Sequence, residues 1–360
     1  MPAIPSSGAI SLSDFAAEFG GTAPHSLSEY YRDGGNVPSN NSNVPTAGAF
    51  RFGQMRGAIN AIIQTLSNTT NVDLSTVFGT DWASSVPKEV IIPSGVTIGG
   101  TGSSDALTAP SGMGGTLTIT NAGSVIGFGG TSGGNGGNAI RIASSGVTVA
   151  NSGLIAGGGG GGGSGGAGGQ GGNGGNGTQH VSGRFVRNTN TNSCGSRPSS
   201  CPAYCYCFQN GTYNMGEDPR MSWYGYDCGI SSGGAGGAGG TGGAGGVGQG
   251  YNQTATTGSS GSSGSSGGAG GTNAGSGGNG GLGGSGGSGG SFGNSGGSGT
   301  AGSNGGSGSN GSNVTSCNTS TSGTAGASSS SGSAGGLAGA AVIHTAAYTM
   351  NNTGTLAGAS

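Results

Sequence analysis

The sequence is poor in charge. Only 6% of its 360 residues are charged, and the formal net charge is -2. Lys88 is the single lysine and the arginines are scattered, so no basic surface is available to neutralise a run of phosphates. After Asp227 none of the remaining 133 residues is Asp, Glu, Lys or Arg, which removes most acid–base chemistry from that part. These absences argue against a nucleic-acid partner and against a catalytic centre near the C-terminus.

Large apolar residues are also few, and they are concentrated early in the chain. Leu, Ile, Val and Phe total 49 residues, and 36 of them precede residue 157. No apolar run approaches the roughly 18 residues of a membrane-spanning helix, and no charged segment followed by an apolar one opens the chain. We therefore expect neither membrane insertion nor export by a visible signal. We also expect that the C-terminal part buries no ordinary hydrophobic core.

Glycine is abundant instead, with 95 residues. A strict Gly-Gly-X period runs through residues 165–176, 233–246 and 277–290. Three residues per turn is the period of a polyproline-II-type helix, and bare glycine backbones can approach closely enough to hydrogen-bond between such helices. A flexible Gly/Ser linker is the alternative. The strict period, and the strand-like segments at both ends of the tracts, favour ordered packing.

The N-terminal segment contains a repeat. Residues 4–15 and 44–55 share the pattern apolar-Pro-x-x-Gly-Ala, which predicts a turn, a short strand and a helical turn in each copy. Apolar residues from Met55 to Leu66 follow at helical spacing, and Ser26 with Glu29 predicts a short capped helix. We expect residues 1–85 to form a small mixed domain.

Residues 86–156 change to period-two segments that predict short strands. A motif Asn-x-Gly-x-aliphatic-x-Gly recurs at 121–127, 151–157 and 352–358, so we expect a C-terminal strand return to this region at 340–358. The expected fold is mostly irregular and β: the mixed domain, a region of short β-rungs, and packed threefold glycine helices with long loops over 157–360. The predicted strands are Val90–Ile92, Val96–Ile98, Leu117–Ile119, Ile140–Ile142 and Val147–Val149.

Three segments interrupt the glycine tracts, at 178–232, 251–257 and 309–331. Aromatic and arginine side chains supply large rigid contact area and directed donors, so their enrichment here predicts a contact surface. The alternative is that the aromatic residues form a small core of the longest loop. The candidate contact residues are Tyr204, Tyr206, Phe208, Tyr213, Arg220, Trp223, Tyr224, Tyr226 and Tyr251.

The six cysteines lie in or near the same loops. An even number in a loop without a core favours disulfides, which would form only after the chain reaches an oxidising exterior, and the pairing stays open. Free buried thiols are the alternative. His180 with Cys205 and Cys207 could in principle bind a metal, but paired C-x2-C spacing is missing, so we expect none. The disulfide candidates are Cys194, Cys201, Cys205, Cys207, Cys228 and Cys317.

Catalysis has little support. Glu217, Asp218 and Asp227 share the aromatic loop and could in principle cleave a glycan. However, Asp218-Pro219 is typical of a turn, the three histidines are scattered, and no G-x-S-x-G occurs. We expect no enzyme, no catalytic residue and no cofactor.

The opening IPSSGAISLSDFAAEFGG with HSLSEYYRDGG resembles N-terminal modules of bacteriophage tail proteins. The Gly-Gly-X tracts separated by variable loops resemble the glycine-rich receptor-binding adhesins at the tips of T-even-type long tail fibres. This resemblance implies a polyglycine-II sandwich. It also implies that residues 1–85 attach to the distal end of a fibre expected to be trimeric. The three loops would then bind an outer-membrane protein or a surface glycan of the host.

The resemblance implies a virion component at the fibre tip, made in the host cytoplasm. A single copy that caps a trimeric fibre and a self-trimerising fibre protein both fit. Two other classes stay open: a structural tail-fibre component without direct receptor contact, and an ice-binding polyglycine protein that uses flat Thr, Ser and Ala faces.

Overall fold

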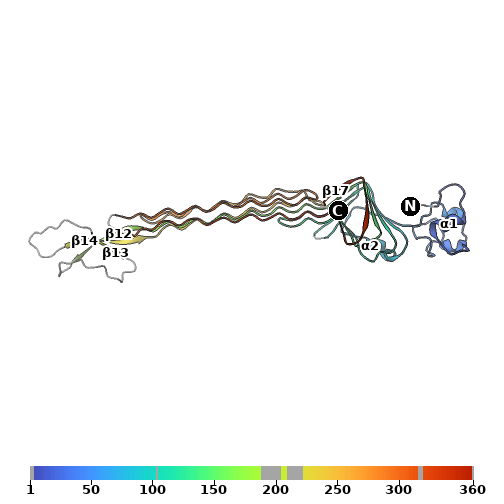
Figure 1. The fold of residues 1–360 in the computed structure, drawn as a ribbon, viewed down its shortest axis with the longest axis horizontal. Coiled ribbons are helices and arrows are strands. Elements are labelled where there is room, and N and C mark those ends of the chain that lie inside the picture. Colours follow the sequence, from blue (N-terminus) through green and yellow to red (C-terminus); the bar gives the residue numbers. More distant parts are fainter. Residues whose placement is uncertain (1–3, 103, 188–203, 209–221, 315–318, 359–360) are drawn as a thin grey trace, which may run out of the picture.

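The protein is elongated and has three parts along its length. The computed structural model describes residues 4–102, 104–187, 204–208, 222–314 and 319–358. A small unit with helix α1 lies at one end, a body of strands follows it, and a long thin rod extends from the body to a small sheet at the far end (Figure 1). The C-terminus returns to the strand body beside β17 (Thr355–Ala357; Figure 1). The structure is mostly strand and irregular, as expected.

The N-terminal unit is built around its aromatic residues. Helix α1 (Leu12–Phe19) begins with a capping box, in which the Ser11 backbone N and Oγ donate to Asp14 Oδ2 at 2.6 and 2.8 Å. Asp14 keeps a lowered pKa because it accepts these bonds. The 3-10 helix η1 (Leu27–Tyr30) confirms the short helix predicted at Ser26. The buried core comprises Ile4, Phe15, Phe19, Tyr30, Val37, Val44, Met55 and Ala58.

Two sequence predictions for this region are wrong. Neither copy of the repeat contains a strand, and no helix spans Met55 to Leu66. The 3-10 helix η2 (Phe52–Met55) ends at Met55 and does not continue, because Gly57 takes a positive φ of 73°. Strand β1 (Ile62–Thr65) then pairs with β4 (Lys88–Ile92), so sheet pairing of these β-branched residues prevails over the helical spacing. The first core thus ends at Ala58, and residues 62–85 pack with the strands rather than with the N-terminal unit.

The strand body is a parallel β-helix, called the coil below. It has five turns, and its strands form three sheets. The first sheet contains β1, β4 (Lys88–Ile92), β7 (Leu117–Asn121), β10 (Val147–Asn151) and β16 (Tyr348–Asn352). The second contains β2 (Thr69–Thr70), β5 (Thr97–Gly99), β8 (Ser124–Ile126), β11 (Leu154–Ala156) and β17 (Thr355–Ala357). The third contains β3 (Val72–Asp73), β6 (Leu107–Ala109), β9 (Ile140–Ile142) and β15 (Val342–His344). The five predicted strands are confirmed as β4, β5, β7, β9 and β10.

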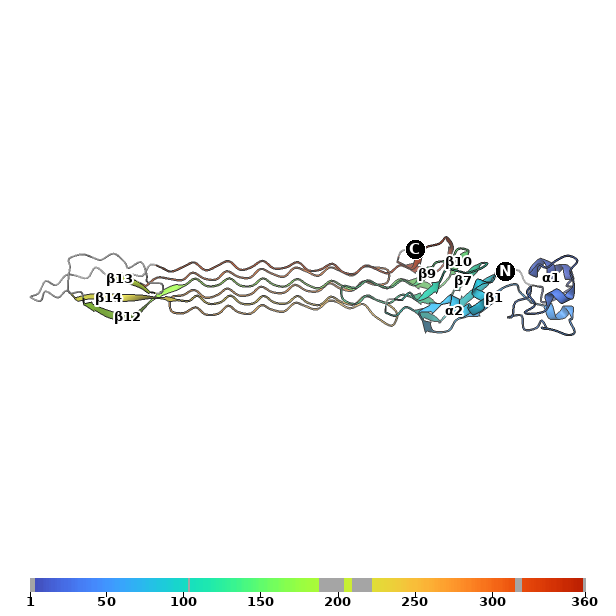
Figure 2. The ribbon, with the colours of Figure 1, turned by 90° about the horizontal axis from the view of Figure 1, so that it is seen from below.

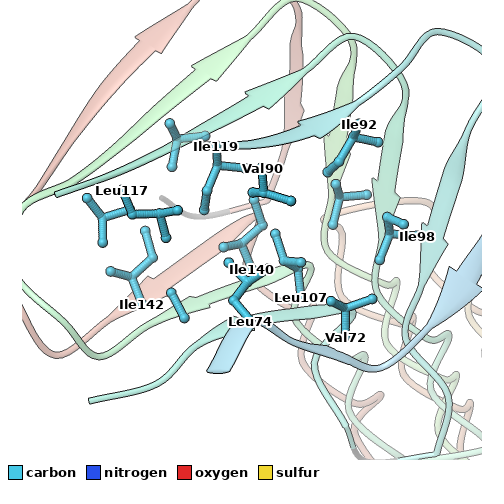
Figure 3. Packing of buried hydrophobic residues seen from close by; sticks show 14 of the residues in the cluster. Val72, Leu74, Val90, Ile92, Ile98, Leu107, Leu117, Ile119, Ile140 and Ile142 are labelled. Carbon is cyan, nitrogen blue, oxygen red and sulfur yellow. The ribbon is translucent and has the colours of Figure 1, made fainter. Parts of the chain in front are cut away.

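The inside of the coil is aliphatic. Inward residues of successive turns stack on one another, as Val90, Ile119 and Val149 do through the β4–β7–β10 register. Each is fully buried. Figure 3 labels Val90 and Ile119 in this core. Helix α2 (Leu74–Phe78) and the 3-10 helix η3 (Gly79–Ala83) join the first turn to the second and add Leu74, Phe78 and Trp82 to this core. This core is the larger of the two buried clusters in the described protein.

An asparagine ladder crosses the last three turns. The Asn121 Nδ2 donates to Asn151 Oδ1 at 2.7 Å, and the Asn151 Nδ2 donates to Asn352 Oδ1 at 2.6 Å. These are the first residues of the three sequence motifs. Because β16 pairs in parallel with β10, and β15 with β9, the C-terminal strands complete turns that begin about 200 residues earlier in the chain.

The rod extends from one corner of the coil, the place where the chain passes from the second sheet to the third. Between the second and third sheets the chain is connected by Asn71 in the first turn, by 100–106 in the second, by 127–139 in the third and by 157–341 in the fourth. Each connection is longer than the one before it. The rod is therefore a very long corner of the coil, and both of its ends are fixed by strand pairing.

Six extended tracts form the rod, at 157–177, 232–250, 254–271, 274–292, 294–312 and 320–340, and they run alternately outward and back (Figure 2). Between two neighbouring tracts the hydrogen bonds recur at every third residue; for example the Gly165, Gly168 and Gly171 N–H groups donate to the Gly243, Gly240 and Gly237 carbonyls at 2.8 Å. The bonds therefore run between tracts, not within them. The backbone groups of the tracts satisfy one another, as an ordered glycine structure requires.

The hydrogen bonds arrange the tracts in two rows of three. Tracts 157–177 and 274–292 lie in the middle of their rows and bond to four tracts each, whereas 254–271 and 320–340 bond to two. The middle tracts contain two glycines per triplet, and the two outer tracts contain mostly one. Glycine content therefore follows the number of backbones that must approach closely.

Candidate receptor-contact end of the rod

The far end of the rod carries an antiparallel sheet in the order β12–β14–β13 (Figure 2). Strand β12 (Gly177–Arg187) continues the first outward tract, and β14 (Ser222–Ser231) leads into the first returning one. Strand β13 (Tyr204–Phe208) pairs with the free side of β14. The sheet is thus attached to the rod through two adjacent tracts.

Thr178 anchors the sheet to the rod. It is fully buried, its N–H donates to the Ser312 carbonyl at 3.1 Å, and its Oγ1 accepts from the Val314 N–H at 2.9 Å. The Asn273 Nδ2 donates to the Thr178 carbonyl at 3.0 Å. Asn273 has a φ of 59°, a conformation that asparagine tolerates better than most residues. Three connections of the rod therefore meet at Thr178.

Thr178 and Asn273 were not identified as anchors from the sequence, because an isolated Thr or Asn beside a glycine tract forms no recognisable motif.

The strand register divides the predicted contact residues between two faces. Tyr204, Tyr206 and Phe208 alternate along β13 and lie opposite Gly229, Asp227 and Gly225 of β14. Alternate positions share a face, so these three share one face with Trp223. Tyr224 and Tyr226 lie on the other face. Tyr213 and Arg220 fall outside the described residues.

The same register aligns two cysteines. Cys205 lies directly opposite Cys228, whose other neighbour across the sheet is His180 of β12. Cys207 lies opposite Tyr226, so among the described strands it is not paired with a cysteine. Cys194, Cys201 and Cys317 fall outside the described residues. In the part of the chain that the structure describes, no three His, Cys, Asp or Glu side chains lie close enough to hold a metal ion.

Tyr251 is not at this end. Its N–H donates to the Gly127 carbonyl at 3.0 Å, and its ring lies over Gly99 of the strand body. Because the tracts alternate in direction, successive connections fall at opposite ends of the rod. The 251–257 segment is therefore a turn beside the body followed by the start of a tract. The 309–331 segment contains the far-end parts of two tracts, and residues 315–318 between them fall outside the described residues.

Of the three carboxylates considered for glycan cleavage, only Asp227 lies in the described part of the chain. Asp227 lies opposite Tyr206 on one side and Ser182 on the other. Glu217 and Asp218 fall outside the described residues. The described groups with shifted pKa values are Asp14, Tyr30, Lys88 and Tyr348, and all four lie in the N-terminal unit or the strand body.

Together these parts define an elongated protein that holds one small sheet at the end of an uncharged rod. Residues 59–265 match the family described as "Phage tail fibre adhesin Gp38". The chain belongs to this family of bacteriophage tail fibre adhesins, whose function is host recognition. A tail fibre adhesin is a component of the virion. The match begins where the N-terminal core ends.

The chain is also similar to a solved structure described as the "gp37-gp38 adhesin tip complex of the bacteriophage S16 long tail fiber". The sequence identity is 17%, the alignment covers 99% of each chain, and the TM-score is 0.36. A comparison with curated proteins finds no match. Among the described residues, no helix has the length and apolar character needed to cross a bilayer.

Proposed function

We propose that this chain is the receptor-binding tip of a tail fibre and that the β12–β14–β13 sheet contacts the host receptor. The observation that carries this proposal is the sheet's position, because it is the part of the described protein farthest from the N-terminal unit (Figure 1). Its strands hold Tyr204, Tyr206, Phe208, Trp223, Tyr224 and Tyr226, the residue types that dominate binding energy at protein interfaces.

The rod is suited to this role. We interpret its tracts as polyglycine-II helices packed as a sandwich, which is supported by the hydrogen bond at every third residue and by the two rows of tracts. A framework held by backbone hydrogen bonds has few side chains whose packing a change in the far-end loops could disturb. The loops can therefore vary with the receptor while the rod keeps its structure.

The N-terminal unit supplies the attachment. Residues 4–58 form a separate core that lies outside the matched family region, and Phe52 is a large apolar residue exposed on it, at 37%. We propose that this unit docks on the distal end of a fibre. The receptor, an outer-membrane protein or a surface glycan, would then meet the opposite end of the molecule.

Replacement of residues 179–230 by a short Gly/Ser bridge tests the receptor site. Thr178 and Ser231 are buried anchors and are kept. The intact protein is expected to bind host cells and to block phage adsorption, and the bridged protein to do neither. Equal blocking by both proteins would place recognition elsewhere, or make the chain a structural fibre component.

Two double variants locate the contact face. Tyr204→Ala with Tyr206→Ala changes one face of the sheet, and Tyr224→Ala with Tyr226→Ala changes the other. One pair is expected to lower host binding at least about 30-fold, as loss of central aromatic anchors does, and the other to change it little. Unchanged binding in both pairs would remove the sheet from the receptor site.

We also propose a disulfide between Cys205 and Cys228. Directly opposed residues in an antiparallel pair have Cβ atoms about 4.5–5.5 Å apart, which a small strand adjustment brings to disulfide distance. The two thiols lose two protons and two electrons to an oxidised small-molecule disulfide, which is reduced to its thiols. Peptide mass mapping of the non-reduced virion protein is expected to find the 205–228 link. Detection of both thiols as free would exclude it, and Cys207→Ser is the matched control because it should leave the link intact.

A further inference from the structure

A groove lies where the rod joins the strand body, at the opposite end of the rod from the proposed receptor site. It has a volume of about 490 Å³, within the roughly 300–1,000 Å³ of small-molecule sites. Three connections line it: the second-turn corner through Thr101, the third-turn corner through Phe128 and Thr131, and the near-end turn through Tyr251 and Gln253. Segments about 150 residues apart in the sequence thus build one surface.

Both aromatic rings in the groove are fixed from behind by glycine backbone. The Tyr251 ring lies over Gly99 and the Phe128 ring over Gly137, so close that a Cβ at either glycine would sit well under 3.0 Å from the ring. The turn that carries Tyr251 is also held by the bond from its N–H to Gly127 and by a 2.8 Å bond from the Gly248 N–H to the Gly130 carbonyl. The rings are therefore positioned before any ligand arrives, which lowers the entropic cost of binding.

The polar groups of the groove are neutral and mostly unpaired. Thr101 is held by Asn71, whose Nδ2 donates to its Oγ1 at 2.6 Å and whose Oδ1 accepts from its N–H at 2.9 Å. Among the described residues, the Tyr251 and Thr131 hydroxyls and the Gln253 amide have no side-chain hydrogen-bond partner. None of the described residues that line the groove is charged. A charged ligand would lose hydration there without gaining an opposite charge, whereas a neutral polar ligand would find donors and acceptors.

We propose that this groove binds a neutral saccharide. A sugar ring presents apolar C–H faces, which stack on aromatic rings, and hydroxyl groups at its edge, which bond to amides and hydroxyls; the groove supplies both kinds of group within one surface. This site is additional to the receptor site of the proposed function. It would give the adhesin a second, weaker contact with polysaccharide that extends from the host surface, and two linked weak contacts raise the overall avidity.

Saturation-transfer NMR on the full-length protein tests the proposal. The probes are glucose, galactose, mannose and N-acetylglucosamine, as monosaccharides and as short oligosaccharides, with glucuronic acid as a charged counterpart. At least one neutral sugar is expected to bind, and glucuronic acid to bind more weakly than that sugar. Absence of transfer to every neutral sugar, or preference for the acid, would overturn the proposal.

Variants link that binding to the groove. Tyr251→Ala is expected to lower the affinity at least about tenfold. Tyr251→Phe keeps the ring over Gly99, and Gln253→Ala removes only an amide; each should cost about two- to tenfold through a lost hydrogen bond. Ser260→Ala, at an exposed position on the rod, is the control. Wild-type affinity in both Tyr251→Phe and Gln253→Ala would refute the site even if Tyr251→Ala misfolds.

This test is separable from that of the proposed function. The protein with residues 179–230 bridged retains the groove and should bind the same sugar with unchanged affinity. Loss of sugar binding in the bridged protein would move the saccharide site to the far-end sheet and overturn the groove assignment.

Discussion

Replacement of Gly169 by alanine is expected to destabilise the rod by about 3 kcal/mol, at the upper end of what overpacking costs. Gly169 lies in the middle tract 157–177, and an added Cβ would sit well under 3.0 Å from the Ala327 carbonyl and the Gly305 N–H. Both groups are backbone and bond to each other at 3.0 Å, so neither can rotate away as a side chain would. Relief requires that two tracts move apart. Thermal unfolding followed by circular dichroism, or urea unfolding, measures the loss.

Gly306→Ala is the matched control. This glycine lies in the same rod, but a Cβ there would meet only Asn279 backbone atoms at 3.5 Å, an ordinary van der Waals distance. Because alanine also restricts the unfolded chain more than glycine does, the variant should be neutral or more stable by about 0.4–1 kcal/mol. Equal, small effects of the two substitutions would mean that the rod is not held by close backbone contacts and behaves as a flexible linker.

The sequence indicated the parts of this fold that depend on local repetition. The three-residue glycine period marks the tracts, because a side chain that faces a packed backbone is excluded at the same place in every triplet. The period-two segments mark the strands of the coil, since inward and outward positions alternate. The three Asn-x-Gly motifs marked equivalent places in successive turns, and their asparagines prove to be the ladder.

Other features could not be read from the sequence because they depend on direction or on distant partners. Tyr251 was grouped with the far-end aromatic residues because it follows a glycine tract as they do. The end of the rod at which Tyr251 lies depends on how many times the chain reverses direction before it. Ile62 and Ile63 fit a helical spacing equally well, and only pairing with β4 makes them a strand. The groove at Phe128 and Tyr251 joins three connections that no local pattern relates.

The two structural parts beyond the N-terminal unit are held together by different means. In the coil, aliphatic side chains are buried, and in the rod, backbone groups bond between tracts. The rod begins and ends in neighbouring strands of the same turn, so its stability depends on the coil remaining closed around β11 and β15. A defect in the last turns of the coil should therefore loosen both parts.

Asn151→Ala is the substitution that tests this dependence most directly. Asn151 is buried at 2% exposure in the middle of the ladder, where it accepts from Asn121 and donates to Asn352. Alanine removes both bonds and deprives the Asn121 and Asn352 amides of their ladder partner, so the expected cost is about 2–4 kcal/mol. Hydrogen exchange should rise first in β15, β16 and β17, which pair with the body only through the neighbouring turns.

Asn352→Ala is the control at the end of the same ladder. Asn352 is exposed and accepts only from Asn151 within the ladder, so its loss should cost about 1 kcal/mol and leave the Asn121–Asn151 bond intact. A cost for Asn352→Ala as large as that for Asn151→Ala would show that the ladder does not couple the turns. A clearly larger cost for Asn151→Ala would show that the asparagine ladder couples the turns. The ladder would then hold the strands that follow the rod in register with the turns that precede it.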